Sequence, residues 1–439
     1  MSGQSGGGKK ETIAVSLTNY LDSGCIVAGA SGLTLWAEHF GLSSFAVGLL
    51  GAISANAFGA AVGALVGGRL SDKFGRKFIY TYNLLIYMFG ALFIIFAMNF
   101  PMLLAGFLIM GLSVGAGVPA SWSYIAEMAH PDSRAHNIGI SQLAWSLGPA
   151  IIFTLGVILA PLGLLGNRLL FVSLVIVAMI AWLLQRQLDE SKDWEEENAR
   201  QSSLQSHEKT HPYRDLFSNI VNRRSIAFLV GVYLFWNLVA GAMGFFMPFV
   251  YETAGGLTNS QANMLQAAMW LLTSLGSYFG FAKLGDKVDQ RKFYFIGALM
   301  AVSSWLVLTF VGMSWIGLWV FVALWGISAG IGAQAFYALW ASELFPTKYR
   351  GGAQGVMFFL VRGSCGVWSI IFPIILANLG FTVAGTFMIG LLIISLFIGT
   401  IWTPKTQGKT LEEITIERYG NNEVKSSTDE FSNGQEVIK

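Results

Sequence analysis

Apolar runs of about 20 residues recur along this chain and constrain its fold more than any other feature. A helix needs about 20 mainly apolar residues to cross the hydrocarbon core of a membrane. The sequence therefore predicts an all-α membrane protein with twelve transmembrane helices. The runs lie near residues 13–36, 45–68, 78–98, 101–124, 137–160, 169–188, 226–251, 262–282, 293–313, 316–340, 352–378 and 382–402.

Composition agrees with this prediction and excludes other classes. Hydrophobic residues make up 54% of the 439 residues and charged residues only 12%, too few to cover the surface of a soluble protein. The apolar runs carry no phosphate-binding loop, metal-ligand cluster or Ser/His/Asp set, so we expect neither an enzyme nor a cofactor or metal. Cys25 and Cys365 fall inside apolar runs, which predicts two free buried thiols. We also expect a monomer that contacts the lipid bilayer and no nucleic acid.

Positive charges fix the expected orientation. Of the 27 Lys and Arg residues, 25 fall on one side of the twelve runs, Arg168 falls on the other, and Arg362 lies inside a run. Lys and Arg accumulate on the cytoplasmic side of membrane proteins. We therefore expect a multi-pass protein of the cell inner (plasma) membrane with both termini in the cytoplasm. The predicted units are a cytoplasmic segment 1–12, a six-helix bundle 13–188, a cytoplasmic linker 189–225, a second six-helix bundle 226–403 and a cytoplasmic tail 404–439.

The two halves of the chain repeat each other. The segment Gly68-Arg69-Leu70-Ser71-Asp72-Lys73 recurs as Ala282-Lys283-Leu284-Gly285-Asp286-Lys287. A second pair, Tyr124 with Glu127 and Trp340 with Glu343, recurs at nearly the same spacing. Two independent motifs at one spacing indicate two duplicated six-helix halves in the same orientation. Such parallel repeats place the substrate site near the middle of the membrane, between the halves.

These motifs resemble those of a known family. The segment Gly68-Arg69-Leu70-Ser71-Asp72-Lys73-Phe74-Gly75-Arg76-Lys77 resembles the conserved loop of the major facilitator superfamily. Tyr124-Ile125-Ala126-Glu127, Glu343-Leu344-Phe345-Pro346-Thr347 and the segment from Thr403 to Ile414 resemble its sugar porters. The resemblance covers roughly residues 13–415. It implies a secondary active transporter, working by alternating access, for a small polar metabolite: a sugar, sugar acid, polyol or other organic acid.

Charged residues of these motifs form the predicted cytoplasmic gate. They stand at the cytoplasmic ends of helices, where acidic and basic side chains can pair when the cavity opens outward. Partly exposed pairs are weak individually, which suits a latch that must open. The alternative is that they only enforce topology and solubility. The predicted gate residues are Arg69, Asp72, Arg76, Glu127, Arg134, Asp286, Arg291, Glu343 and Arg350.

Several hexose-contact positions of sugar porters are not preserved. The family's Gln-Gln pair aligns with Phe235-Trp236, and many members carry Arg at the position of Phe107. The resemblance therefore implies the scaffold more firmly than a hexose substrate. Aromatic residues of the seventh to tenth runs can stack on a sugar ring, although lipid contact, helix packing or an interfacial position explains each of them more simply. They are Phe245, Phe246, Trp270, Trp325, Tyr337 and Trp340. The predicted substrate-binding residues are polar groups in apolar runs: Gln142, Arg362, Asn237, Gln266, Gln334, Tyr337 and Asn19.

Asp22 is the predicted site of proton coupling. The segment Tyr20-Leu21-Asp22-Ser23-Gly24 resembles the Tyr-Asp-x-Gly of proton-coupled sugar porters. A low-dielectric cavity favours the neutral form of a carboxyl group, which can then exchange protons near neutral pH. The alternative is a structural acid that is hydrogen-bonded to neighbouring helices. Without coupling, the chain would be a facilitator or an exporter. A non-transporting nutrient sensor fits less well, because the tail is short.

Arg362 is the other ionisable residue deep in a run. A charge at the centre of a membrane helix costs about 2.5–3.5 kcal/mol on insertion scales, so a partner is expected. One candidate is Asp22, in an ion pair between the halves. Another is an anionic group on the substrate, which an Arg can bind bidentately. A third possibility is that Arg362 has no partner role and only helps to fix the orientation of the chain in the membrane, as a positive charge on the cytoplasmic side.

The expected orientation predicts a labelling pattern. With a membrane-impermeant maleimide added from the periplasmic side, Gly256→Cys should react and Ser206→Cys should not, because Ser206 lies in the predicted cytoplasmic linker. Mass-spectrometric detection of the adduct measures the outcome. The reverse pattern would overturn the predicted topology.

Overall fold

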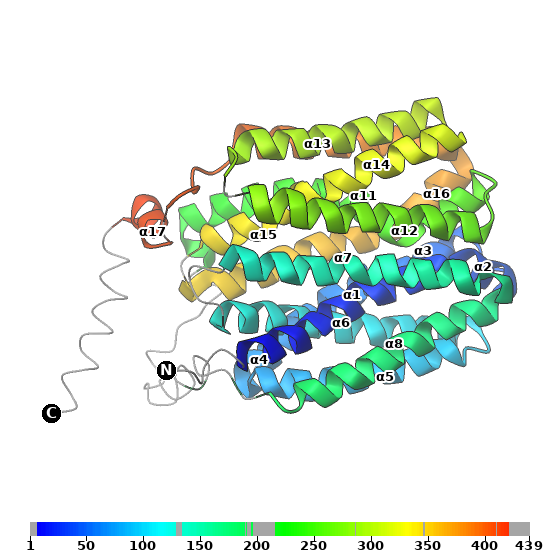
Figure 1. The fold of residues 1–439 in the computed structure, drawn as a ribbon, viewed down its shortest axis with the longest axis horizontal. Helices are drawn as coiled ribbons and strands as arrows, with labels where there is room; N and C mark the ends of the chain where they lie inside the picture. Colours follow the sequence, from blue (N-terminus) through cyan, green and yellow to red (C-terminus); the bar gives the residue numbers. More distant parts are fainter. Residues whose placement is uncertain are drawn as a thin grey trace.

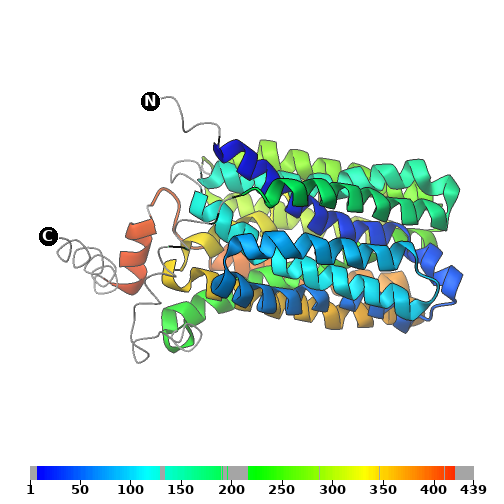
Figure 2. The same cartoon turned by 90° about the horizontal axis from the view of Figure 1, so that it is seen from below.

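A computed structural model of the chain describes residues 7–128, 134–188, 190, 195, 216–285, 287–345, 347–409 and 411–420. Every regular element in these ranges is a helix, as the sequence predicts. The long helices run side by side along one direction (Figure 1). Helix α17 lies at the end where α1 begins, and a view turned by 90° agrees (Figure 2). We call this the near end of the bundle and the opposite one the far end.

The helices fall into two groups along the chain. Those of the first half are α1 (Gly7–Ser31), α2 (Leu33–Phe40), α3 (Ser44–Ile53), α4 (Phe58–Phe74), α5 (Arg76–Ile95), α6 (Phe100–Met128), α7 (Arg134–Leu159), η2 (Ala160–Leu162) and α8 (Leu164–Gln185). Those of the second half are α11 (Ile220–Thr253), α12 (Asn259–Leu275), η3 (Gly276–Ala282), α13 (Gln290–Leu306), η4 (Val307–Val311), α14 (Trp315–Ile331), α15 (Ala333–Glu343), α16 (Thr347–Ile401) and α17 (Leu411–Tyr419).

These helices fit the predicted membrane spans. Within the described residues, nine helical stretches are long and apolar enough to cross a membrane. The last of them, Gly352–Ile401, contains two predicted spans. The chain turns between those two at Gly380, whose φ of 80° is readily adopted only by glycine. Helices α1–α2 and α12–η3, outside the nine, cover the first and eighth predicted runs.

One break inside a predicted span prepares the central site. Helix α3 ends at Ile53 and α4 begins at Phe58, so Ser54–Ala57 interrupts the second apolar run. The Ser54 hydroxyl accepts a hydrogen bond from the backbone N–H of Asn56 at 3.1 Å. Non-helical backbone at membrane depth is tolerated where protein buries it or where it lines a cavity. The break therefore presents Asn56, side chain and carbonyl, to the middle of the bundle.

Glycines bring α4 and α6 into close contact, as the spacing of Gly59, Gly63 and Gly67 predicts. A Cβ atom at Gly59 would lie 2.9 Å from the Cα of Gly111, and one at Gly63 would lie 3.0 Å from the Cα of Gly115. Small residues allow membrane helices to approach this closely and gain dispersion contacts.

This packing predicts a contrast between two glycine substitutions. Gly63→Ala should lower stability by about 1–3 kcal/mol, because its methyl group overpacks the interface with α6. Gly390→Ala should stay within about 0.5 kcal/mol of the wild type, because no atom lies within 4 Å of the added Cβ. Thermal unfolding of the purified variants in detergent measures both. Equal melting temperatures for the two would contradict the packing argument.

Candidate substrate-binding site

A cavity lies between the two halves in the middle of the bundle. It offers about 70 Å³ to the centres of water-sized molecules, several times what one water needs. Helices α1, α3–α4 and α7 line it from the first half, and α11, α12, η3, α14, α15 and α16 from the second. The lining residues are Ser23, Ile26, Val27, Asn56, Gln142, Trp145, Ser146, Pro149, Trp236, Asn237, Ala240, Gly241, Met243, Gly244, Trp270, Thr273, Ser277, Phe281, Trp325, Ala329, Gly330, Gln334, Ala335 and Arg362.

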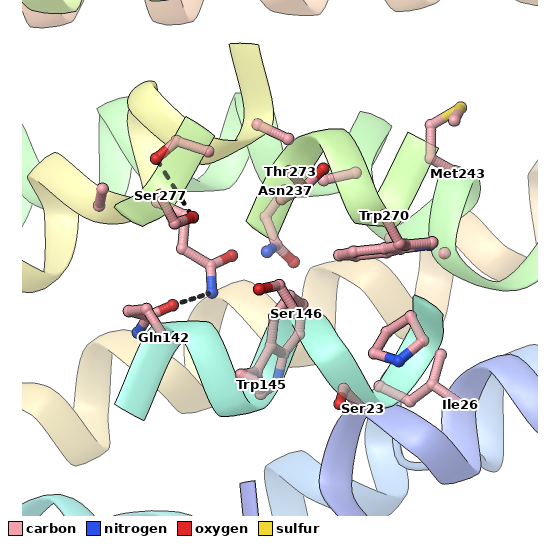
Figure 3. Close-up of a pocket in the computed structure, with 18 of the residues that line it drawn as sticks. Ser23, Ile26, Gln142, Trp145, Ser146, Asn237, Met243, Trp270, Thr273 and Ser277 are labelled. Carbon is pink, nitrogen blue, oxygen red and sulfur yellow. Dashed lines mark hydrogen bonds between the residues drawn. The ribbon is translucent and has the colours of Figure 1, made fainter. Parts of the chain in front are cut away.

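Hydrogen bonds between the halves cross this cavity. The Ser274 hydroxyl of α12 donates to the Ser146 hydroxyl of α7 at 2.9 Å. The Gln334 amide of α15 reaches the Gln142 amide oxygen of α7 over 3.5 Å (Figure 3). The second bond is at the long limit for an N–H···O contact. A bound polar molecule can therefore replace it at little cost.

Arg362 of α16 reaches across to the break between α3 and α4. Its Nη1 donates to the Asn56 backbone carbonyl at 3.0 Å and to the Asn56 side-chain oxygen at 3.3 Å. The Asn56 amide nitrogen donates in turn to the carbonyl of Gly241 on α11 at 3.1 Å. The guanidinium also lies 5.1 Å from the ring centroid of Phe358. These contacts give the buried charge polar partners within the protein.

Asn237 of α11 presents a third amide to the cavity. Its side chain points toward the middle of the site (Figure 3). The Cys365 thiol donates to the Asn237 side-chain oxygen at 3.0 Å, which fixes the orientation of the amide. Cys365 and Cys25 are both free and buried, as predicted.

Four tryptophans contribute apolar surface to the cavity. Trp145 of α7 and Trp270 of α12 meet edge to face across the halves, with ring centroids 5.5 Å apart. Trp236 of α11 stacks near Trp325 of α14, with centroids 6.4 Å apart. Flat aromatic faces beside amides and hydroxyls can bind a ring that has apolar C–H faces and a polar edge.

Asp22 lies directly behind this surface. It is buried on α1, and its carboxylate accepts a hydrogen bond from the Trp145 indole N–H at 3.1 Å. Arg362 interacts with it electrostatically, although the Nη1 of Arg362 is bonded to Asn56 instead. Because Trp145 lines the cavity and bonds to Asp22, it connects the acid to the cavity. At the position where many sugar porters carry Arg, Phe107 packs edge to face on Phe245, with ring centroids 6.2 Å apart.

The structure brings four of the seven predicted binding residues together. Gln142, Asn237, Gln334 and Arg362 line the cavity. The other three lie outside the lining: Asn19 is buried on α1, Gln266 on α12, and Tyr337 stacks on Tyr233 with ring centroids 4.1 Å apart.

Several lining residues were not among the predicted ones. Trp145 is an apolar residue within an apolar run, so the sequence offers no contrast that marks it. Trp236 is marked only by the resemblance, which places it at the Gln-Gln pair of sugar porters. Ser146, Thr273 and Ser277 are small hydroxyl residues of the kind that also bond within their own helices; Thr273 does so, to the Met269 carbonyl at 3.0 Å. For Ser146, the four-residue helical spacing from Gln142 is the available signal.

Most of the predicted gate lies outside the described side chains. This applies to Arg69, Asp72, Arg76, Glu127, Arg134, Asp286 and Arg350. Of the remaining two, Arg291 is exposed at the start of α13 and Glu343 is half-buried at the end of α15. The gate stays a prediction.

Toward the far end the two halves pack closely. A Cβ atom at Gly48 of α3 would lie 2.8 Å from the carbonyl oxygen of Ser369 and 2.9 Å from the Cα of Ile370, both on α16. These are backbone atoms, so the site tolerates no larger residue without separation of the helices. The Asn259 side chain of α12 also donates to the Ser31 carbonyl of α1 at 2.8 Å.

The chemistry of the cavity favours a neutral, hydroxyl-rich ligand. Amides and hydroxyls both donate and accept hydrogen bonds, as the hydroxyl groups of a polyol do. Among the described residues no cluster of His, Cys, Asp or Glu has the arrangement of a metal site. Because both halves contribute polar groups, a ligand bound here contacts both.

Comparisons with known proteins agree with this architecture. Residues 12–258 match the profile of the Major Facilitator Superfamily. The minor myo-inositol transporter IolF of Bacillus subtilis (strain 168) is 45% identical over 426 residues, which cover 96% of this chain and 97% of the relative.

Two solved structures share the fold. The D-xylose-proton symporter structure is 18% identical with a TM-score of 0.74, covering 92% of this chain and 99% of its own. The inward-open xylose transporter XylE from E. coli is 20% identical with a TM-score of 0.72, covering 94% and 100%.

The contact at Gly48 predicts a conformational bias. Gly48→Val should shift the chain toward a state with the far end open by about 5- to 150-fold, since overpacking of about 1–3 kcal/mol is relieved when the halves separate. Electron–electron distance measurements between spin labels at the exposed Met98 and Ile316 report this separation. Gly390→Val, where no atom crowds the added Cβ, is the matched control. An unchanged distance distribution in Gly48→Val would contradict the argument.

Proposed function

The chain belongs to the major facilitator superfamily, and we propose that it is a proton symporter for a neutral cyclic polyol, myo-inositol or a close analogue. Membership in this family makes it a multi-pass membrane transporter rather than an enzyme. The observation that carries the polyol proposal is the cavity itself. Amides from both halves, Gln142, Asn237 and Gln334, share it with tryptophan faces.

A neutral substrate fits better than an anion because of the position of Arg362. Its Nη1 is bonded to Asn56, and Asn56 is bonded to Gly241, so the guanidinium already connects the two halves. These contacts offset part of the cost of the buried charge, so an anionic substrate is not needed for that purpose. The relative that is 45% identical is named as a transporter of myo-inositol, a neutral polyol, which supports the same choice.

Proton coupling is proposed for Asp22. The acid is buried, and it contacts the cavity through the Trp145 indole. A ligand that displaces Trp145 changes the hydrogen bonding of Asp22, and thus its tendency to hold a proton. Substrate binding and protonation are thereby linked through one side chain.

Orientation and gating complete the proposal. Both termini and the linker 189–225 lie in the cytoplasm, and the protein resides in the cell inner membrane. The near end of the bundle is then the cytoplasmic end, where the predicted acidic and basic residues pair to close the cavity. The 25-to-1 distribution of Lys and Arg supports this orientation.

Uptake into proteoliposomes tests the substrate and its charge. With a potential of 100 mV, worth about 2.3 kcal/mol per charge, one proton carried with myo-inositol should allow about 50-fold accumulation. A sugar monoanion carried with one proton moves no net charge and should respond to the pH gradient alone. If only sugar acids are carried, the polyol proposal is wrong.

A substitution tests the coupling residue. Asp22→Asn should abolish accumulation against a gradient but leave exchange of labelled for unlabelled polyol intact, because the neutral amide cannot take up the proton. Glu413→Gln, on the exposed face of α17, is the control and should accumulate normally. If Asp22→Asn still accumulates the polyol against its gradient, Asp22 is not the coupling residue. If the wild type exchanges the polyol but does not accumulate it, the protein is a facilitator.

A further inference from the structure

A line of side chains that carry polar atoms continues from the cavity along η3 and α12 toward the far end. In order from the far end, it consists of Asn259, Asn263, Gln266, Trp270 and Thr273 on α12 and Ser277 on η3. The spacing of alternately four and three residues keeps the five residues of α12 within about 80° of the helix circumference. The last three line the central cavity, and the first three lie beyond it. The line therefore leads from the cavity toward the far surface.

Both halves meet along this line. Helix α12 lies beside α7 (Figure 1), and a Cβ atom at Gly156 of α7 would lie 3.2 Å from the Asn263 amide. Asn263 donates to the Asn259 side-chain oxygen at 2.9 Å, and Asn259 donates to the Ser31 carbonyl of α1 and to Glu252 of α11. These contacts of Asn259 and Asn263 close the far end of the line in the present conformation.

Beneath that contact, polar groups are buried without partners. Both amide atoms of Gln266 lack a hydrogen bond, as do the Tyr251 hydroxyl of α11 and the side-chain oxygen of Asn263. Gln266, Tyr251 and Asn263 are each fully buried. The Tyr251 hydroxyl and the Gln266 side chain are neighbours, but their geometry is not that of a hydrogen bond. Unpartnered buried groups are rare in folded proteins, and each requires an explanation.

We propose that Gln266, Tyr251 and Asn263 form an outer subsite that binds the hydroxyl-rich substrate before it reaches the central cavity. The inference rests on the proposed polyol transport. Separation of α12 from α1 and α7 at the far end breaks the Asn259–Ser31 contact and exposes these groups. Two amides and a phenol then offer both donors and acceptors to polyol hydroxyls. When the far end closes, the substrate has moved on to the cavity, and the groups stand without partners.

The chemistry of α12 supports a path rather than a packing surface. Helix interfaces in membranes are enriched in small residues, as at the contact of α4 with α6, and their Asn and Gln side chains hydrogen-bond across the helices. Neither amide atom of Gln266 makes such a bond here. Asn263 and Gln266 are larger and polar, and they stand in register with Thr273 and Ser277 of the cavity. Trp270 lies between the two groups and lines the cavity, so it separates the outer subsite from the central one.

Two conservative variants test the outer subsite in the full-length protein. Transport of labelled myo-inositol is measured in right-side-out and inside-out membrane vesicles. Tyr251→Phe and Gln266→Leu each remove hydrogen-bonding groups from the subsite. Each should raise the apparent KM about 3- to 10-fold, the loss of one net hydrogen bond, in the vesicles that present the far end outward. In vesicles of the other orientation the KM should stay within about 2-fold.

A matched control removes a similar group elsewhere. The Thr309 hydroxyl is also buried without a partner, but it lies on η4, away from the line. Thr309→Val should leave the KM unchanged in both orientations. Melting temperatures verify that the variants fold. If Gln266→Leu does not fold, the test rests on Tyr251→Phe, which removes only one oxygen atom.

Two outcomes would overturn the subsite. An equal rise of KM from both sides would place these residues in the central site, and an unchanged KM in both variants would mean that only water contacts them. Absence of myo-inositol transport by the wild type would instead overturn the proposed function, so the two failures are distinguishable.

Discussion

Buried polar groups in a membrane protein must find partners within the protein, and this constraint organises the whole molecule. No water in the bilayer core replaces a missing hydrogen bond, and each unmet group is costly. The chain places its deep polar side chains between its two halves, where they meet one another: Ser274 with Ser146, Gln334 with Gln142, and Arg362 with Asn56. Contacts of this kind hold the halves together, and the 3.5 Å bond between Gln334 and Gln142 is the one most easily exchanged for a ligand.

The same constraint explains why alternating access is compatible with this fold. Far-end closure depends on close backbone approach at Gly48 and on a few amide contacts such as Asn259 with Ser31. Both kinds of contact are lost together when the halves separate, and polar groups then meet water or substrate. A buried acid, Asp22, accepts a hydrogen bond from Trp145, which lines the cavity. Protonation can therefore respond to what occupies the cavity without a direct bond to it.

Sequence reasoning predicted the fold well because its signals are local. Apolar runs, charge asymmetry and the repeated motifs give the helices and their grouping, and Gln142, Asn237, Gln334 and Arg362 stand out as polar residues in apolar surroundings. Trp145 could not be found in this way, because an indole in an apolar run carries no contrast. Trp236 could be found only through the resemblance, which places it at the Gln-Gln pair of sugar porters. Tyr337 is also marked by its polarity, but it stacks on Tyr233 outside the cavity lining, so its role in binding stays a prediction. The partner of Arg362 could not be foreseen either, because the helix break at Ser54–Ala57 that exposes the Asn56 carbonyl lies inside an apolar run.

The central claim is that one neutral polyol bridges both halves in this cavity, and a cryo-electron microscopy structure of the full-length protein saturated with myo-inositol in nanodiscs tests it most directly. The account predicts density for one ring beside Trp236 or Trp270, with hydroxyl groups in hydrogen-bond reach of Gln142 and Gln334 and the 3.5 Å bond between those amides replaced. Density that contacts only one half, or no ligand density between these amides at saturation, would contradict it.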